Sequence, residues 1–372
     1  MSSARIEVID AGLAVAIQDL GRTGFRRLGV PLSGALDPAL LALANALAGN
    51  DPGAAALEVP LVGPTLAVRS GTVRFALAGP IGATVQGAGE GSEASKPQVV
   101  APWSTVTLGV GDVIKIGAVG KVDQAQRLAL GYVAVSGGIG VPLVLGSRST
   151  YARAALGGFN GRALAAGDEL TCANATGDAR GATPGGDSAL ELRGAAPFAH
   201  EGGPIRLVAG PQTENFEGVA FELLESEAFS VSRDSDRMGL RLSGPKLQHS
   251  ALGPDIASDG VTPGAIQVPA DGQPIVLMAD CQTVGGYPKI ATVIRADLPR
   301  LAHFRPGDFL RFRLVTLAEA GEARMALARR LAQWILRIAP FCASGSLDEA
   351  ALYGCNLVSG MVRADASEDD AQ

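Results

Sequence analysis

A Gly-Asp pair stands among apolar residues in the stretch Leu301-Ala302-His303-Phe304-Arg305-Pro306-Gly307-Asp308-Phe309-Leu310-Arg311-Phe312. Glycine enters the backbone conformations of tight turns without steric cost, and aspartate hydrogen-bonds the amides of such turns. Apolar residues follow the pair directly, as they do in a strand that buries at least one face. The stretch therefore predicts a turn that leads into a β-strand.

The same pattern occurs twice more, at Gly111-Asp112 in the segment 105–116 and at Gly167-Asp168 in the segment 163–171. Two of the copies share a second feature, since Arg153-Ala154-Ala155-Leu156 precedes one and Arg295-Ala296-Asp297-Leu298 precedes another. We interpret this as an internal duplication of a β-rich unit. Two copies are too few to indicate a solenoid.

The chain has 372 residues, more than a usual single core, which predicts two domains. Glycine, proline and charged residues gather between Gly177 and Pro204, where we place the linker. We therefore expect β domains over residues 1–190 and 205–315, a helix over 316–340 and a tail over 341–372 whose acidic end is disordered.

Two helices stand out from the short strands. Asp37-Pro38 precedes an apolar run that Gly49 closes, which gives an N-cap, a proline at the first position and a glycine just past the end. Thr316 and Glu319 form a capping box ahead of apolar residues at helical spacing. The 49 glycines and 22 prolines indicate many turns, so the sequence predicts a mainly β fold with a few helices.

Composition and charge exclude several classes of function. The formal net charge of −6 argues against nucleic-acid binding. No apolar run reaches the roughly 18 residues that a membrane helix needs, and no signal segment opens the chain, so we expect a cytoplasmic protein without a membrane partner. The four cysteines lack C-x-x-C spacing, and His200, His249 and His303 lie far apart in the sequence, so we expect no metal centre.

The strongest candidate for a site is Asp280-Cys281-Gln282-Thr283-Val284-Gly285-Gly286-Tyr287-Pro288-Lys289, directly after an apolar run. We expect Gly285 and Gly286 to let the backbone approach a ligand, with Gln282, Thr283 and Tyr287 as hydrogen-bonding groups for the substrate. Lys289 and Asp280 are the catalytic candidates here, with Lys289 stabilising an oxyanion or phosphate. We expect its substitution to leave stability nearly unchanged, as for an exposed residue. The alternative is a structural hairpin with a solvated lysine.

Three further groups are candidates, each with a structural alternative. Arg237, a third catalytic candidate, is suited to clamp a carboxylate or phosphate beside Asp236, or pairs with Asp236 to hold a turn. Gln18, Asp19 and Arg22 lie at a strand-to-turn boundary as substrate-binding candidates, although Asp19 can simply satisfy turn amides. Glu58 lies in an apolar context and needs a partner such as Arg22 or Arg26, or a reactive role.

Several blocks, in a fixed order from about Ile6 to Phe312, resemble the family called allophanate hydrolase subunit 2, or KipA. The blocks are Gln18 to Gly24, Gly34 to Asp37, Asn45, Gly49 to Asp51, Ala56 to Glu58, Ser235 to Leu242 and Asp280 to Lys289. The resemblance implies two cyclophilin-like β-barrel domains packed against a B-type, KipI-like subunit. It also implies the C subunit of an ATP-dependent 5-oxoprolinase, which opens the 5-oxoproline lactam to glutamate together with A-type and B-type subunits.

The same resemblance leaves two alternatives open. One is a carboxyltransferase component that moves a carboxyl group from carboxybiotin to urea or a related amide. The other is a non-catalytic regulatory partner of a KipI-like protein. The sequence has neither a phosphate-binding P-loop nor a Met-Lys-Met biotinylation pattern. We therefore expect ATP to be bound within the complex, and biotin, if the carboxyltransferase alternative holds, to be carried on another chain.

Overall fold

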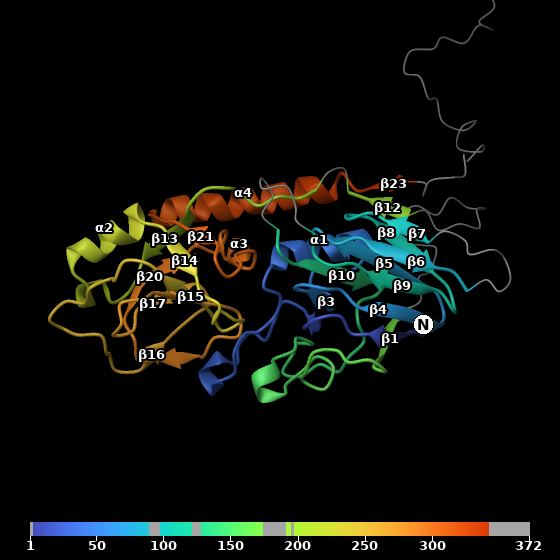
Figure 1. The fold of residues 1–372 in the computed structure, drawn as a ribbon, viewed down its shortest axis with the longest axis horizontal. Helices are drawn as coiled ribbons and strands as arrows, with labels where there is room; N and C mark the ends of the chain where they lie inside the picture. The colour runs from blue at the N-terminus through green and yellow to red at the C-terminus, as the bar shows by residue number, and fades with distance from the viewer. Residues whose placement is uncertain (1–2, 89–96, 121–127, 174–190, 195–196, 342–372) are drawn as a thin grey trace, which may run out of the picture.

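The computed structural model describes residues 3–88, 97–120, 128–173, 191–194 and 197–341, which form a mainly β protein (Figure 1). Its larger sheets gather in an N-terminal half, residues 3–173, and a C-terminal half, residues 205–314. The predicted fold class, mainly β with a few helices, is confirmed. No helix in the described ranges is long and apolar enough to cross a membrane.

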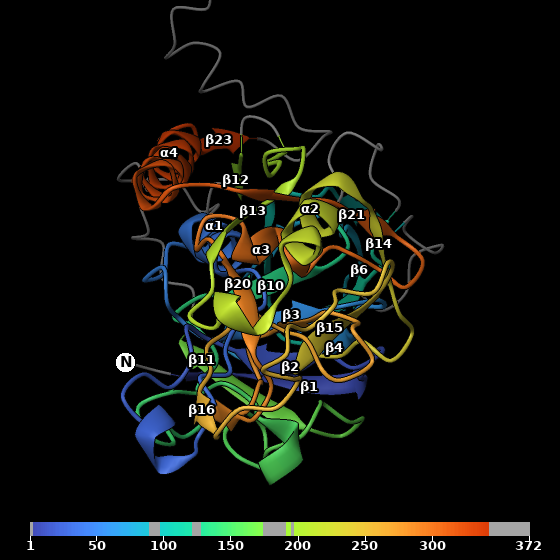
Figure 2. The ribbon, with the colours of Figure 1, turned by 90° about the vertical axis from the view of Figure 1, so that its left-hand side faces the viewer.

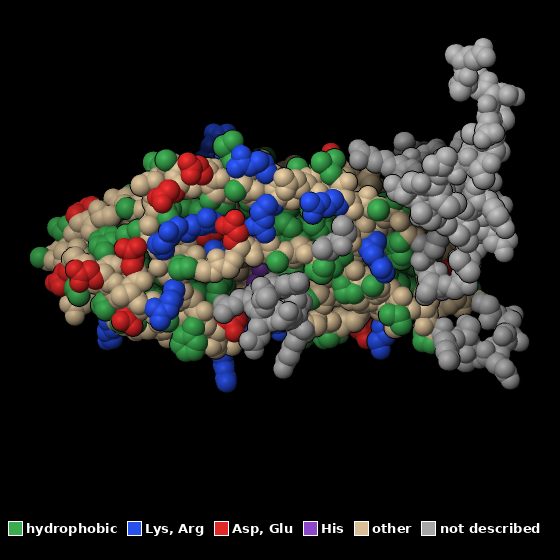
Figure 3. Space-filling view, turned by 90° about the horizontal axis from the view of Figure 1, so that it is seen from above, with side chains coloured by type: hydrophobic (Ala, Val, Ile, Leu, Met, Phe, Trp, Pro, Cys, Tyr) green, Lys and Arg blue, Asp and Glu red, His purple; other side chains and the backbone are tan. Residues whose placement is uncertain are grey.

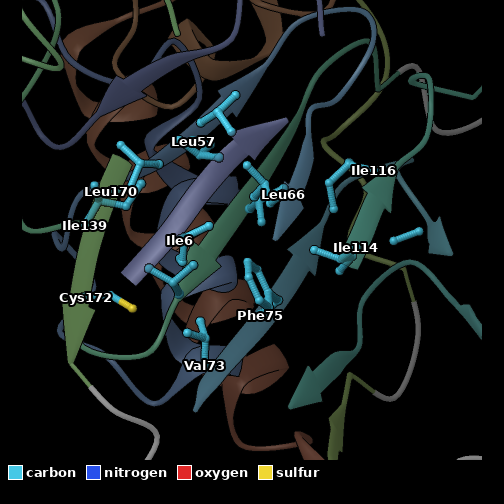
Figure 4. Packing of buried hydrophobic residues seen from close by; sticks show 14 of the residues in the cluster. Ile6, Leu57, Leu66, Val73, Phe75, Ile114, Ile116, Ile139, Leu170 and Cys172 are labelled. Carbon is cyan, nitrogen blue, oxygen red and sulfur yellow. The ribbon is translucent and has the colours of Figure 1, made fainter. Parts of the chain in front are cut away.

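Two antiparallel sheets make up the N-terminal half. The first has the order β11 (Glu169–Ala173), β1 (Ser3–Asp10), β4 (Thr65–Ser70), β9 (Val113–Ile116), β6 (Ala83–Gln86) and β7 (Gln98–Val100). The second has the order β2 (Ala16–Gln18), β3 (Ala56–Val59), β10 (Gly131–Val135), β5 (Val73–Ala78) and β8 (Thr105–Leu108). Their inner faces share one apolar core, in which Ile6 and Leu66 from one sheet meet Leu57 and Phe75 from the other (Figure 4).

Helix α1 (Pro38–Ala48) covers the outer face of the second sheet. Alternate residues of a strand face opposite sides, so Phe75 of β5 points into the core between the sheets while Ala76 packs on the side of Leu40 and Leu41 of α1. Every residue of β5 is consequently buried. The small alanines on this face let the helix lie close to the sheet.

The C-terminal half is built on one sheet that closes nearly into a barrel. Its order is β21 (Phe309–Leu310), β14 (Phe229–Val231), β15 (Gly239–Ser243), β18 (Ile275–Leu277), β17 (Ala265–Gln267), β20 (Lys289–Val293), β13 (Ile205–Ala209) and β22 (Phe312–Leu314). The two edge strands, β21 and β22, are separated in sequence by Arg311 alone, so the chain itself brings the edges together. β13 and β22 pair in parallel, and the other pairs are antiparallel.

Helix α4 (Leu317–Ile335) lies along both halves, on the side of the molecule that carries α1 (Figures 1 and 2). Leu331 and Ile335 pack against the core that α1 shares with the second sheet, whereas Ala323 contacts Ile294 of the C-terminal half. Charged side chains and scattered apolar ones share this outer face (Figure 3). After α4, β23 (Ala339–Phe341) pairs with β12 (Glu191–Arg193), and Arg193 of β12 bridges to Ser104, so the C-terminal segment returns to the N-terminal half.

The three Gly-Asp turns have the same geometry, which confirms the predicted turn-to-strand pattern. Gly111, Gly167 and Gly307 adopt φ values of 91°, 86° and 90°. In each turn the aspartate side chain accepts the backbone N–H three residues earlier, from Gly109, Ala165 and Arg305. The glycine N–H and the aspartate C=O then pair with one residue of a neighbouring strand, namely Val68, Val8 and Val231. The larger duplication stays a prediction. The two Arg-Ala-x-Leu stretches differ in structure: the first begins in the 3-10 helix η2 (Ala152–Ala154), whereas the second ends at Leu298, where helix α3 (Leu298–Leu301) begins.

Other expectations are refined by the structure. Asp37 caps α1 and Thr316 caps α4 with its capping box, as predicted, but α4 ends at Ile335 rather than at residue 340. Helix α2 (Gly218–Ser226) and the 3-10 helices η1 (Arg26–Leu28) and η3 (Thr213–Asn215) were not predicted. The expected linker falls largely on residues 174–190 and 195–196, and the tail on residues 342–372, which lie outside the described residues. The domain limits therefore stay a prediction.

Candidate functional site

Arg237 joins the two halves of the molecule. It precedes β15, and its Nε and Nη2 donate to Asp280, at 2.8 and 3.3 Å, while Nη1 donates to Glu58 of β3. Nη2 also donates to the backbone carbonyl of Gly34, at 2.6 Å. Burial works against the charged guanidinium, but the carboxylates of Glu58 and Asp280 outweigh it and raise the pKa of Arg237. The predicted candidates Arg237, Asp280 and Glu58 thus form one ion-paired cluster at the junction of the halves.

The cluster continues through Tyr132 of β10. The Tyr132 hydroxyl donates to Glu58 Oε2 at 2.5 Å and accepts the backbone N–H of Asp37 at 3.1 Å. Glu58 Oε2 also accepts the N–H of Leu36, at 2.9 Å. Burial, together with the nearby carboxylates of Glu58 and Asp37, raises the pKa of Tyr132 well above its usual range. Tyr132 therefore remains a neutral donor that fixes the orientation of Glu58.

Asp37 holds two histidines at the N-terminus of α1. Its Oδ1 accepts the N–H groups of Ala39 and Leu40, at 2.9 and 3.0 Å, as an N-cap does. Its Oδ2 lies 2.6 Å from His200 Nε2 and 2.9 Å from His303 Nε2. Burial opposes the ionised form of Asp37, but the charges and hydrogen bonds of His200 and His303 together lower the pKa of this carboxyl well below its ordinary value. His200 and His303, which are 103 positions apart in the sequence, thus meet at Asp37 in the folded chain.

These three residues offer ligand atoms within 4.8 Å of one another, a spacing that a metal ion can use. However, His303 Nδ1 accepts the backbone N–H of Ala129, at 2.9 Å, so the ring proton of neutral His303 is on Nε2. A metal-binding imidazole presents the opposite arrangement, with the lone pair toward the metal and the other nitrogen donating. The donor set therefore fits hydrogen bonding to Asp37 and not a metal centre.

Asp19 organises the loop after β2. Its Oδ1 accepts from the hydroxyls of Ser147 and Ser149, at 2.6 and 2.5 Å, and from the N–H of Gly21. Its Oδ2 accepts the N–H of Arg148, at 2.6 Å. Burial would raise the pKa of Asp19, but these hydrogen bonds prevail and lower it. Asp19 therefore satisfies the backbone amides of Gly21 and Arg148, and its role in substrate binding stays a prediction.

Gln18 and Arg22 lie next to Asp19 and are almost fully buried, at 1% and 0% exposure. The Gln18 Nε2 donates to Thr150 O at 3.2 Å, and Arg22 donates to the carbonyls of Val144 and Ser149. One polar atom of each side chain, Gln18 Oε1 and Arg22 Nη1, is buried without a hydrogen-bond partner, and Arg26 Nη1 shares this property. Arg26 of η1 reaches to the other half of the molecule, where its Nη2 donates to Val261 O and Gln282 O.

The predicted stretch 280–289 forms a turn and the short strand β19 (Val284–Gly285), which pairs with β16 (Asp259–Gly260). Gln282 Nε2 donates to Gln267 Oε1 at 3.1 Å, and the carbonyl of Tyr287 accepts from Gln267 Nε2 at 3.2 Å. A side chain at Gly285 would meet Gln267 at 2.6 Å, so the glycine makes room for this glutamine, whereas Gly286 is less crowded. Thr283 receives the N–H of Val261 on its carbonyl, and Tyr287 is 42% exposed. Burial, the largest effect, raises the pKa of Cys281, as suits an unreactive thiol.

Lys289 is buried, which corrects the expectation of an exposed cation. The residue is 3% exposed and opens β20, and its Nζ pairs with Asp259 at 2.7 Å. It lies opposite Gln267 in the register of β17 and β20. A path of contacts therefore runs from Arg26 through Gln282 and Gln267 to Lys289.

Two ion pairs that the sequence suggested are wrong. Glu58 pairs with Arg237 and Tyr132 instead of Arg22 or Arg26. Asp236 does not pair with Arg237 but with Arg153, at 3.0 Å, and caps its own turn through the N–H of Met238. Three further members of this network, Tyr132, His200 and His303, were not predicted from the sequence. The buried position of Tyr132 in an apolar strand was the one signal available, since a buried phenol needs a hydrogen-bond partner.

The chain matches known proteins over most of its length. Residues 28–314 match the family described as carboxyltransferase domain, subdomain A and B. The C subunit of 5-oxoprolinase from Escherichia coli (strain K12) is 36% identical over 333 residues, which cover 90% of this chain and 98% of that protein. The urea amidolyase of Lachancea kluyveri is 34% identical over 82% of this chain but only 17% of its own length. Among solved structures, the urea amidolyase of K. lactis superimposes with a TM-score of 0.72 at 25% identity, covering 93% of this chain and 20% of that one.

Proposed function

Because this chain belongs to the family of the carboxyltransferase domain, subdomain A and B, we propose that it is the C subunit of an ATP-dependent 5-oxoprolinase. Its complex would open the 5-oxoproline lactam to glutamate, with ATP cleaved to ADP and phosphate and two waters consumed. The observation that carries the proposal is the match in length. The chain covers 98% of the C subunit of the Escherichia coli 5-oxoprolinase, whereas it covers 17% of a urea amidolyase.

The geometry of the junction supports a role in binding and polarising a small amide. Amide resonance makes lactam opening slow, and positioned positive charge at the lactam oxygen, or phosphorylation of that oxygen, weakens the bond. Arg237 is held at the junction by Glu58 and Asp280, and Lys289 is held within the C-terminal half by Asp259. The proposed share of this protein is to place the lactam, while A-type and B-type subunits complete the reaction and the binding of ATP.

The test is reconstitution with A-type and B-type subunits of a 5-oxoprolinase. We expect the three-component mixture to form glutamate and ADP from 5-oxoproline and ATP, and each component alone to be inactive. Avidin should have no effect, because no biotin takes part. Full lactam opening by the single chain, or none by the mixture, would contradict the proposal.

A carboxyltransferase role is the second candidate, favoured by the structural similarity to urea amidolyase. It predicts carboxylation of urea or a related amide that requires a biotinylated carrier and is blocked by avidin. Tight binding of a KipI-like protein without turnover in either assay would favour a regulatory role instead.

A further inference from the structure

Three unpartnered atoms point to a subsite. In the described part of the chain, the buried side-chain nitrogen and oxygen atoms without a hydrogen-bond partner are Gln18 Oε1, Arg22 Nη1 and Arg26 Nη1. All three belong to one short segment that runs from the end of β2 into η1. A buried polar atom without a partner is costly, and proteins leave few of them. Their concentration in one segment therefore calls for a bound group that satisfies them.

The rest of each side chain is held firmly. The Gln18 amide donates to the carbonyl of Thr150 and the Arg22 guanidinium donates to that of Ser149, so both groups are anchored to the same backbone segment. Gly157, at φ 67°, packs directly on the Arg22 guanidinium and leaves no room for a side chain there. Arg26 is held by Val261 O and Gln282 O. The free atoms are thus preorganised, so a ligand would bind them without ordering them first.

The positive charge of this segment lacks a direct ion pair. Neither Arg22 nor Arg26 has a carboxylate within ion-pair distance among the described residues. Burial, the largest effect, lowers the pKa of Arg22, although the charges of Asp19 and Asp280 act against it from beyond that distance. Asp19 already accepts from two hydroxyls and two backbone amides. A buried guanidinium without an ion pair favours an anion, and arginine binds carboxylates especially well.

We propose that Gln18, Arg22 and Arg26 form a subsite for a small amide that carries a carboxylate. The two free guanidinium donors would bind the carboxylate, and Gln18 Oε1 would accept the amide N–H. The inference rests on the proposed function, since 5-oxoproline has both groups on one ring. Urea offers the N–H groups but no carboxylate. Arg26 extends the subsite to the 280–289 stretch through Gln282, and so toward Lys289.

Binding to the full-length chain tests the subsite apart from turnover. Titration calorimetry would compare 5-oxoproline with 2-pyrrolidinone, which lacks the carboxylate, and with cyclopentanecarboxylate, which lacks the N–H. We expect 5-oxoproline to bind at least about tenfold more tightly than either. Arg26→Met and Gln18→Met should each remove most of this preference, and Arg22→Lys should weaken it while keeping the charge. Arg27→Met, an exposed arginine of the same segment, is the matched control and should bind as the wild type does.

The outcomes separate the subsite from the proposed function. Biotin, an amide with a carboxylate, belongs in the panel because it carries both groups on a different scaffold. If biotin binds, 5-oxoproline does not, and the same variants lose that binding, the subsite stands and the oxoprolinase assignment falls. If no compound of the panel binds, or if Arg26→Met and Gln18→Met bind as tightly as Arg27→Met, the subsite is overturned. The circular dichroism spectrum of each variant must match that of the wild type. Lysine is chosen at position 22 because a larger change at this buried arginine could unfold the chain.

Discussion

At the scale of single residues, Arg237 has the largest predicted effect on stability. It neutralises two buried carboxylates, Glu58 and Asp280, which are 4% and 7% exposed. Removing one member of a buried ion-paired group leaves the others uncompensated and typically costs about 3–5 kcal/mol. We expect Arg237→Met to lower the free energy of unfolding by about 3 kcal/mol or more in urea denaturation. Arg241→Met, at an exposed position two residues into β15, should change it by less than about 0.5 kcal/mol.

An unfolding free energy of Arg237→Met equal to that of Arg241→Met would contradict this reading of the junction. A useful second variant is Glu58→Gln, which keeps a hydrogen-bond acceptor for Tyr132 but removes one charge. Because Arg237 then retains Asp280, we expect a smaller loss than for Arg237→Met.

Lys289 is the residue for which we predict the clearest effect on turnover. Its side chain is buried on a strand position opposite Gln267, and its carboxylate partner Asp259 is half exposed. We propose that it supplies positive charge to the reacting amide, so Lys289→Met should lower turnover of the reconstituted complex by about 10²-fold, as loss of one preorganised charged donor does. Methionine keeps the buried stem, so the change in stability should remain small.

The matched control for Lys289 is Lys246→Met, at an exposed position of the same half, which should leave turnover unchanged. Normal turnover of Lys289→Met would make the Lys289 and Asp259 pair purely structural. The catalytic charge would then be sought at Arg237.

At the scale of elements, the N-terminus of α1 predicts a dependence of stability on pH. Burial, as the main cause, lowers the pKa of His303 below its usual 6.5, against the raising effects of Asp37 and Glu58 and together with the lowering effect of His200. Near pH 6.5, His303 therefore binds a proton in the unfolded chain but stays neutral in the folded chain. The free energy of unfolding consequently falls as the pH decreases from 6.5 toward the lower pKa of the folded state. The pKa of Asp37 is lowered as well. The stability that the ionised Asp37 provides is therefore lost only when the pH falls below 3.8, the usual pKa of this carboxyl.

We expect the free energy of unfolding to decrease between about pH 7 and pH 5, and His303→Gln to reduce this slope. Glutamine keeps a donor for Asp37 Oδ2 but does not titrate. His249→Gln serves as the control, because within the described ranges His249 contacts the carbonyl of Val268 and no carboxylate. An unchanged slope in His303→Gln would show that another group carries the dependence.

At the scale of the whole molecule, α4 and the Arg237 cluster connect the two halves. Trp334 near the end of α4 packs edge-on against Trp103 of the N-terminal half, with ring centroids 5.5 Å apart, while Ala323 packs on the C-terminal half. We expect the chain to unfold in a single calorimetric transition. Trp334→Ala should cost about 3–5 kcal/mol, as for other buried aromatic truncations, and separate the transition into two.

Leu336→Ala, two positions further along and 84% exposed, is the control for Trp334 and should leave the single transition in place. Two transitions already in the wild type would mean that the contacts across the halves are weaker than the packing indicates. The interface would then resemble that of independently stable domains.

What the sequence determined by itself is local. The three Gly-Asp turns, the Asp37 cap and the Thr316 capping box depend on residues within about four positions of one another, and all were predicted correctly. The mainly β class and the family also followed from such short blocks. Local hydrogen bonds and φ preferences are encoded where they occur, so a single sequence suffices to recognise them.

Only the tertiary structure decided which groups meet at the junction. Glu58 and Arg237 are 179 positions apart, and Asp37 and His303 are 266 positions apart. Nothing in a run of residues states which distant partner will neutralise a buried charge, because that depends on how the two halves pack. For the same reason the sequence showed Gln18 and Arg22 only as polar residues at a strand-to-turn boundary, and Arg22 and Arg26 only as partners for Glu58. That each keeps one buried atom free for a ligand follows from the contacts that satisfy all the others.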